Sequence, residues 1–131
     1  MCGGEIFSAG NIQSTNYPEN YLAMQNCEWI IIFSDGYKIK LDFIHFDLEY
    51  QSTCQYDWLE IRNGNASTSP LIGNRLCGDK IPGSVLSSGN ELYMKFSSDG
   101  SKSRAGFEIN VSKSNATGKP LTLCQYFSIS I

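Results

Sequence analysis

A chain of 131 residues, of which 41% are hydrophobic and 18% charged, is long enough for one domain with a buried core, and this composition excludes a disordered chain. The formal net charge is −3 and the ten basic residues are scattered, which excludes the basic surface of a nucleic-acid-binding domain. The longest apolar run, Trp29 to Phe33, is too short to be a transmembrane segment and suits a buried strand.

Short strands are predicted over residues 27–33, 38–43, 58–61, 91–96 and 107–112. In the second of these, Ile39, Leu41 and Phe43 alternate with polar residues, and the last two segments alternate in the same way. A period of two with β-branched and aromatic residues is typical of half-buried strands. Clusters of turn residues separate the segments, and no window sustains the apolar period of a helix. The pattern predicts an all-β fold, a two-sheet antiparallel sandwich or jelly roll.

One domain is predicted over residues 2–112, because this part of the chain has no internal repeat and no linker. Residues 113–120 are polar and rich in turn formers, whereas residues 121–131 are apolar and isolated. We expect residues 113–131 to be a linker into a neighbouring module or a tail that packs on the sandwich.

The cysteines and glycosylation sequons indicate an oxidising, extracellular environment. One histidine and no Cys-x-x-Cys spacing argue against a zinc site, so a disulfide framework with one cysteine left over is expected among Cys2, Cys27, Cys54, Cys77 and Cys124. Sequons for N-glycosylation begin at Asn65, Asn110 and Asn115. The protein is therefore expected to be secreted or on the cell surface. Cys124 is expected to pair with a neighbouring module, to bridge two chains or to remain free.

Three acidic residues from distant parts of the chain form a candidate metal site. Glu49 and Asp57 lie on either side of Cys54, and Asp99 lies far downstream. If they meet, their repulsion must be relieved by a cation or by shifted protonation. Oxygen ligands in an extracellular protein favour Ca²⁺. The simpler interpretation is three solvated loop carboxylates.

Catalysis is not expected. His45 is the only histidine, so a catalytic Ser/His/Asp or Cys/His arrangement is not expected. Glu49 and Asp57 could be taken for a glycosidase pair, but the sequence indicates no substrate cleft or sugar-binding scaffold.

The chain resembles the CUB domain family in an ordered series of motifs: Cys2-Gly3-Gly4, Asn16-Tyr17-Pro18-Glu19-Asn20-Tyr21, Cys27-Glu28-Trp29, Cys54-Gln55-Tyr56-Asp57, Leu76-Cys77-Gly78, Ser98-Asp99 and Gly106-Phe107. The resemblance covers roughly residues 2–112. It implies two packed antiparallel sheets with the disulfides Cys2–Cys27 and Cys54–Cys77.

Some CUB domains bind calcium, and the resemblance implies that Glu49, Asp57, Asp99 and the main-chain carbonyl of Ser101 are ligands here. It also implies that Tyr17 lies beside the acids and helps to hold their geometry. In related domains a lysine or arginine of a partner reaches the acidic ligands of the ion.

The resulting hypothesis is a calcium-dependent protein-recognition module of a larger extracellular protein, which binds Lys or Arg side chains of a protein ligand. The alternative is a calcium-independent adhesion module, or a homo- or hetero-oligomerisation module, with its interface on a sheet near Trp58 or in the apolar tail.

Overall fold

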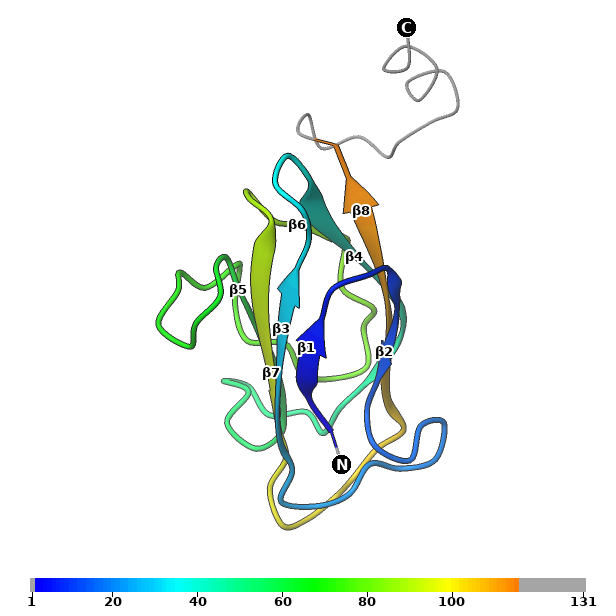
Figure 1. Cartoon of the computed structure of the whole chain (residues 1–131). Helices are drawn as coiled ribbons and strands as arrows, with labels where there is room; N and C mark the ends of the chain where they lie inside the picture. The colour runs from blue at the N-terminus through cyan, green and yellow to red at the C-terminus, as the bar shows by residue number, and fades with distance from the viewer. Residues whose placement is uncertain (1, 116–131) are drawn as a thin grey trace, which may run out of the picture.

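Residues 2–115 are described by the computed structural model, and they form two four-stranded sheets packed face to face (Figure 1). The first sheet has the strand order β1-β3-β7-β5 and the second the order β2-β8-β4-β6. Their bounds are β1 Gly4–Ile6, β2 Gly10–Gln13, β3 Asn26–Ile32, β4 Lys38–Asp47, β5 Trp58–Arg62, β6 Val85–Leu86, β7 Glu91–Ser97 and β8 Gly106–Ser114. Within this range there is no helix that could span a bilayer.

The predicted all-β sandwich is confirmed. The five predicted strands correspond to β3, β4, β5, β7 and β8, while the shorter β1, β2 and β6 were not predicted. All strand pairs are antiparallel except β1 with β3, which is parallel. Strand β4 continues past Phe43 to Asp47. A register shift between Phe43 and His45 inserts one extra residue, Ile44, which is 50% exposed. This bulge breaks the alternation on which the sequence prediction depended.

The core lies between the two sheets and is built from the inward-facing residues of the alternating strands. It includes Ile39, Leu41, Leu92, Met94, Phe96, Phe107, Ile109 and Val111, each at most 1% exposed. The Phe107 ring contacts Trp29 and Phe96 edge-on, with centroid separations of 6.0 and 5.3 Å. Burial of these side chains is the main favourable contribution to folding, and the aromatic contacts join strands of both sheets.

Two disulfides close the sandwich as the family resemblance implied. Cys2–Cys27 ties the start of the chain to β3, with a Cα–Cα distance of 5.3 Å, and Cys54–Cys77 joins two loops with a distance of 5.6 Å. Each bridge is expected to stabilise the fold by about 2–4 kcal/mol. Cys124 lies outside the described residues.

Strand β8 extends to Ser114, two residues beyond the boundary drawn at 112. Lys113 and Ser114 pair with Ile39 and Lys38 of β4. The Nζ atom of Lys113 lies 5.5 Å from the ring centroid of Phe33. The rest of the predicted tail, residues 116–131, lies outside the described residues.

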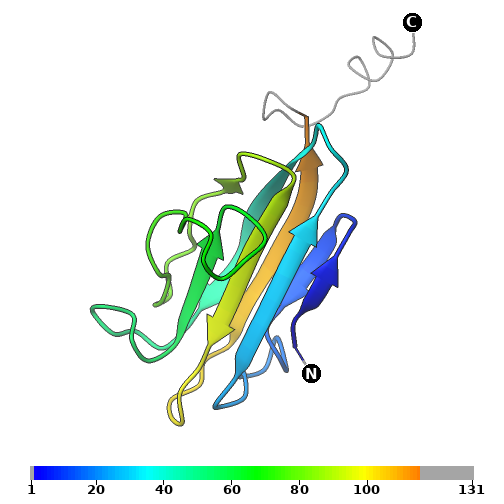
Figure 2. The same ribbon diagram turned by 60° about the vertical axis from the view of Figure 1, so that its left-hand side comes forward.

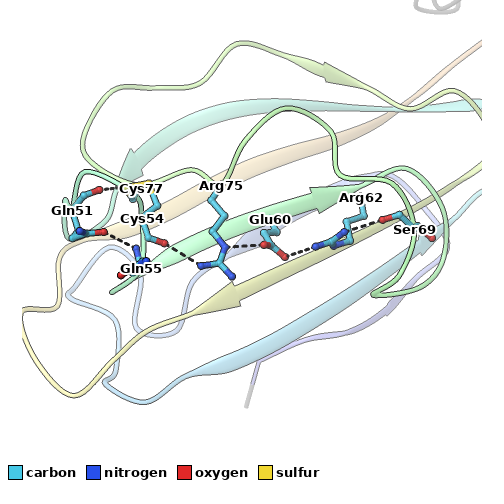
Figure 3. Close-up of polar contacts among 8 residues, drawn as sticks. All are labelled: Gln51, Cys54, Gln55, Glu60, Arg62, Ser69, Arg75 and Cys77. Atoms are coloured by element: carbon cyan, nitrogen blue, oxygen red, sulfur yellow. Dashed lines mark hydrogen bonds and ion pairs between the residues drawn. A yellow bond between two sulfur atoms is a disulfide. The ribbon is translucent and has the colours of Figure 1, made fainter.

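An ionic cluster lies on the outer face of the first sheet (Figure 3). Glu60 accepts hydrogen bonds from Arg62 at 3.1 Å and from Arg75 at 2.8 Å, and Figure 3 shows its carboxylate between the two guanidinium groups. The guanidinium of Arg75 also lies 4.0 Å from the ring centroid of Trp58. Burial raises the pKa of Glu60, but the two arginines outweigh it and hold the pKa below its ordinary value. One face of the Trp58 ring therefore contacts an arginine of the same chain.

Replacing Glu60 with Gln should lower the free energy of unfolding at neutral pH by about 1–2 kcal/mol, because two charge-assisted hydrogen bonds are weakened at a partly solvated site. A lowered folded-state pKa gives stability that is present above the ordinary Glu pKa and is lost as the pH falls through the folded-state value. The deficit of Glu60→Gln should therefore shrink in acid. Urea denaturation at several pH values measures it.

The exposed Glu5, on β1, offers a matched control. Glu5→Gln should leave stability nearly unchanged at every pH. A deficit for Glu60→Gln that is as large in acid as at neutrality would contradict the ionic explanation.

Candidate metal centre

Glu49, Asp57 and Asp99 meet at one end of the sandwich. Each offers a carboxylate oxygen, and these oxygens lie within 4.8 Å of one another. Glu49 follows β4 of the second sheet, whereas Asp57 precedes β5 and Asp99 follows β7 in the first sheet. Figures 1 and 2 show that the β4–β5 and β7–β8 connections lie at the same end of the molecule. The acidic cluster is thus assembled across both sheets by the strand topology.

Hydrogen bonds within the protein join the segments that carry Asp57 and Asp99 to each other and to the β2–β3 segment. The N–H of Asp99 donates to Asp57 Oδ1 at 2.8 Å, and the carbonyl of Asp99 accepts the N–H of Met24 at 2.9 Å. The hydroxyl of Ser98 accepts the N–H of Gln25 and donates to the carbonyl of Leu22, both at 2.9 Å. The β2–β3 segment is therefore fastened to the segment that carries Asp99.

Tyr21 links two of the acids directly. Its ring is 2% exposed and packs edge-on against Phe96 at a centroid separation of 5.2 Å. Its hydroxyl donates to Asp57 Oδ2 and accepts the N–H of Glu49 at 3.1 Å. Burial and the hydrogen bond to Asp57 raise the pKa of Tyr21, so the phenol stays protonated and remains a donor.

Tyr17, which the sequence analysis placed beside the acids, lies in other surroundings. Its ring is 5.7 Å from that of His45, and its N–H donates to the carbonyl of Ser14 at 3.2 Å. The supporting position expected for Tyr17 is occupied by Tyr21, from the same sequence motif. Tyr21 differs from Tyr17 by its packing on Phe96 and by its hydrogen bonds to Asp57 and Glu49, and no sequence pattern showed these contacts.

Ser101 lies in the Asp99 segment, where its N–H donates to Asp99 Oδ1 at 3.1 Å. This bond orients one carboxylate oxygen of Asp99. The role of the Ser101 carbonyl as a ligand stays a prediction.

Burial and mutual proximity make ionisation of the clustered acids unfavourable. Glu49 and Asp57 are only 8% and 1% exposed. Burial, followed by the charges of Asp99 and Asp57, raises the pKa of Glu49. Burial also raises the pKa of Asp57, against the hydrogen bonds from Tyr21 and the Asp99 N–H. In the described part of the chain, Glu49 Oε1 is buried and has no hydrogen-bond partner. An unpaired buried carboxylate oxygen is costly, and a hard cation bound there would remove the cost.

A cavity of about 480 Å³ opens beside the cluster, and Glu49, Tyr50, Asp79 and Lys102 contribute to its lining. Lys102 opposes the rise in the pKa of Glu49. Ligands could reach the acidic end through this opening.

Two of the three predicted glycosylation sequons lie wholly within the described residues. Asn65 is exposed, and its amide donates to Glu91 Oε2 at 3.2 Å. Asn110 lies on the outer face of the second sheet, where its amide donates to Asn11 Oδ1 at 2.9 Å. The sequon of Asn115 extends into residues outside the described range. Their glycosylation stays a prediction.

Without divalent cations, the protein should become more stable as the pH falls from neutrality towards the ordinary pKa of a carboxylic acid side chain, because the pKa values of Glu49 and Asp57 are raised. An acid whose pKa is raised by folding destabilises the folded state when ionised, so protonation of Glu49 and Asp57 restores stability. Thermal melts in metal-free buffers test this. Glu49→Gln should flatten the dependence, while Glu5→Gln should retain it; equal slopes in all three proteins would contradict the explanation.

Known proteins are similar to this chain in sequence. The CUB domain family profile matches residues 2–111. Bone morphogenetic protein 1 of Xenopus laevis is 45% identical over 114 residues, covering 86% of this chain and 16% of that protein. Tolloid-like protein 1 of Mus musculus is 47% identical over 114 residues, covering 86% of this chain and 11% of that protein. This chain therefore spans less than a fifth of the length of these relatives.

A solved CUB domain structure is also similar to this chain. The crystal structure of the MASP-1 CUB2 domain bound to Ca²⁺ matches with a TM-score of 0.74 and 28% identity, covering 85% of this chain and 99% of that one. Since the family profile extends over most of the sequence, the chain belongs to the CUB domain family.

Proposed function

We propose that this CUB domain is a calcium-dependent protein-recognition module of a larger extracellular protein. Its ion would be held by Glu49, Asp57, Asp99 and the main-chain carbonyl of Ser101. The observation that carries the proposal is the buried, unpartnered Oε1 of Glu49 within a group of three converging carboxylates.

The donor set fits calcium. Ca²⁺ takes six to eight oxygen ligands from carboxylates, carbonyls and water in a flexible geometry. A related CUB domain, MASP-1 CUB2, is bound to Ca²⁺ in its crystal structure, which supports the same ion here. Extracellular sites of this kind have dissociation constants of about 10⁻⁴–10⁻³ M, which suits millimolar surroundings.

The ion would organise recognition and would not catalyse a reaction. Three carboxylates and one Ca²⁺ leave one net negative charge at the surface. The remaining carboxylate lone pairs can accept charge-assisted hydrogen bonds from a lysine or arginine of a partner protein. Tyr21 would keep Asp57 and the Glu49 backbone in place. The sole histidine, His45, contacts Tyr17 and takes no part in this arrangement.

Calcium at a few millimolar should raise the Tm of the chain by about 5–10 °C, since binding to the folded state alone contributes about 1–2 kcal/mol at these affinities. Asp99→Asn should abolish the shift, because it removes a ligand charge while it keeps the size of the side chain. Differential scanning fluorimetry with added calcium and with chelator measures both effects.

The matched control is Asp35→Asn, which removes an exposed carboxylate from the β3–β4 turn at the other end of the sandwich (Figure 1). It should keep the full shift. If calcium leaves the Tm of the parent chain, which carries no substitution, unchanged, the proposal is wrong. Self-association or partner binding that persists in the presence of a chelator would favour the calcium-independent adhesion or oligomerisation module.

The two tyrosines should differ in their effect on calcium affinity. Tyr21→Phe removes the hydroxyl that links Asp57 to the Glu49 N–H, and loss of a group that positions metal ligands weakens binding by roughly tenfold or more. Tyr17→Phe should leave affinity unchanged. Calorimetric calcium titration of the two variants measures the affinities. A loss of affinity in Tyr17→Phe but not in Tyr21→Phe would show that Tyr17 has the supporting role.

A further inference from the structure

Large apolar side chains stand exposed around the acidic end of the sandwich. We define the apolar rim as Leu22, Met24, Tyr50 and Tyr56, which are 49%, 75%, 72% and 49% exposed. Tyr50 follows Glu49 and Tyr56 precedes Asp57, so two of the rim residues adjoin acidic residues of the cluster. Single exposed apolar residues are normal, but several beside one charged site indicate an interaction surface.

Hydrogen bonds hold the backbone of Leu22 and Met24 although the side chains of both residues are exposed. The N–H of Met24 donates to the carbonyl of Asp99, and the carbonyl of Leu22 accepts the hydroxyl of Ser98, both at 2.9 Å. The Tyr50 ring lies over Gly78, where an added Cβ would come within 3.4 Å of Tyr50 Cδ1. Tyr50 also lines the cavity beside Glu49. Little backbone ordering is therefore needed when a partner covers these residues.

Charge decides which partner the rim suits. Asp47, Glu49 and Asp79 outnumber Lys102 and Arg104 in the lining of the cavity, and Arg104 is paired with Asp47 at 3.0 Å. Asp57 and Asp99 add further negative charge beside it. With one calcium ion bound the end stays acidic, which favours a basic side chain over an anionic lipid surface.

We propose that the apolar rim selects the residues next to the basic side chain, so that the preferred partner segment carries a Lys or Arg flanked by apolar or aromatic side chains. This rests on the proposed function. The ammonium or guanidinium group lies against the acidic cluster, and its neighbours cover Met24 and Tyr50. Tyrosine and methionine are enriched at protein interfaces, and a central tyrosine often contributes strongly to affinity.

Two immobilised peptides of equal length and charge test the proposal on the full chain: one with the core Phe-Lys-Leu and one with the core Ser-Lys-Ser. In millimolar calcium the first should bind roughly tenfold more tightly, and Tyr50→Ser and Met24→Ser should each remove most of that preference. The matched control is Phe7→Ser, because Phe7 is 61% exposed and lies in the β1–β2 turn. It should keep the preference.

The calcium-induced rise in Tm is measured on the same proteins and should persist in both rim variants. If calcium does not raise the Tm of the parent chain, the proposed function is wrong. If calcium raises the Tm but the two peptides bind equally, or neither binds, only the proposed role of the apolar rim is wrong. Preference that survives both rim substitutions also overturns it. The parent chain could instead bind phosphatidylserine-containing vesicles in calcium, while the rim variants do not. That result would overturn the peptide proposal and identify a membrane as the partner of the apolar rim.

Discussion

The contact of Phe96 with both Tyr21 and Phe107 is the interaction on which the acidic cluster of Glu49, Asp57 and Asp99 depends. Its ring meets Phe107 of the second sheet within the core, and it meets Tyr21 beneath the acidic cluster. Because Glu49 follows a strand of one sheet while Asp57 and Asp99 flank strands of the other, their separation is set by how the sheets pack. Apolar packing thus holds together three like charges that would otherwise separate.

Two sets of buried acidic side chains in this small domain affect its stability in opposite directions. Glu60 is stabilised by two arginines of its own chain, so its ionisation favours folding. Glu49 and Asp57 are buried beside another acid, so their ionisation opposes folding. A carboxylate cluster that lowers stability and leaves a buried oxygen unpaired is a common mark of a functional site. This contrast separates a structural ionic cluster from a candidate binding site better than burial alone.

Periodicity could predict the long strands, because one face of each is buried and the alternation of Ile39, Leu41 and Phe43 shows it. The strands β1, β2 and β6 are too short to show a period, and the bulge at Ile44 hid the second half of β4. The convergence of the three acids followed from the family resemblance, since no local pattern encodes a distance between remote residues. Tyr21 was missed because its packing on Phe96 and its hydrogen bonds to Asp57 and Glu49 join residues that are remote in the sequence.

The hydrogen bonds among Tyr21, Asp57 and Asp99 have a consequence for how the domain would respond to its surroundings. Because these bonds already hold the ligand-bearing segments, the arrival of an ion would order few residues and would cost little conformational entropy. The sandwich could then gain or lose calcium while it remains folded. Its acidic end would carry a strong negative potential at low calcium and a weak one at high calcium, so a single rigid shape could present two electrostatic surfaces.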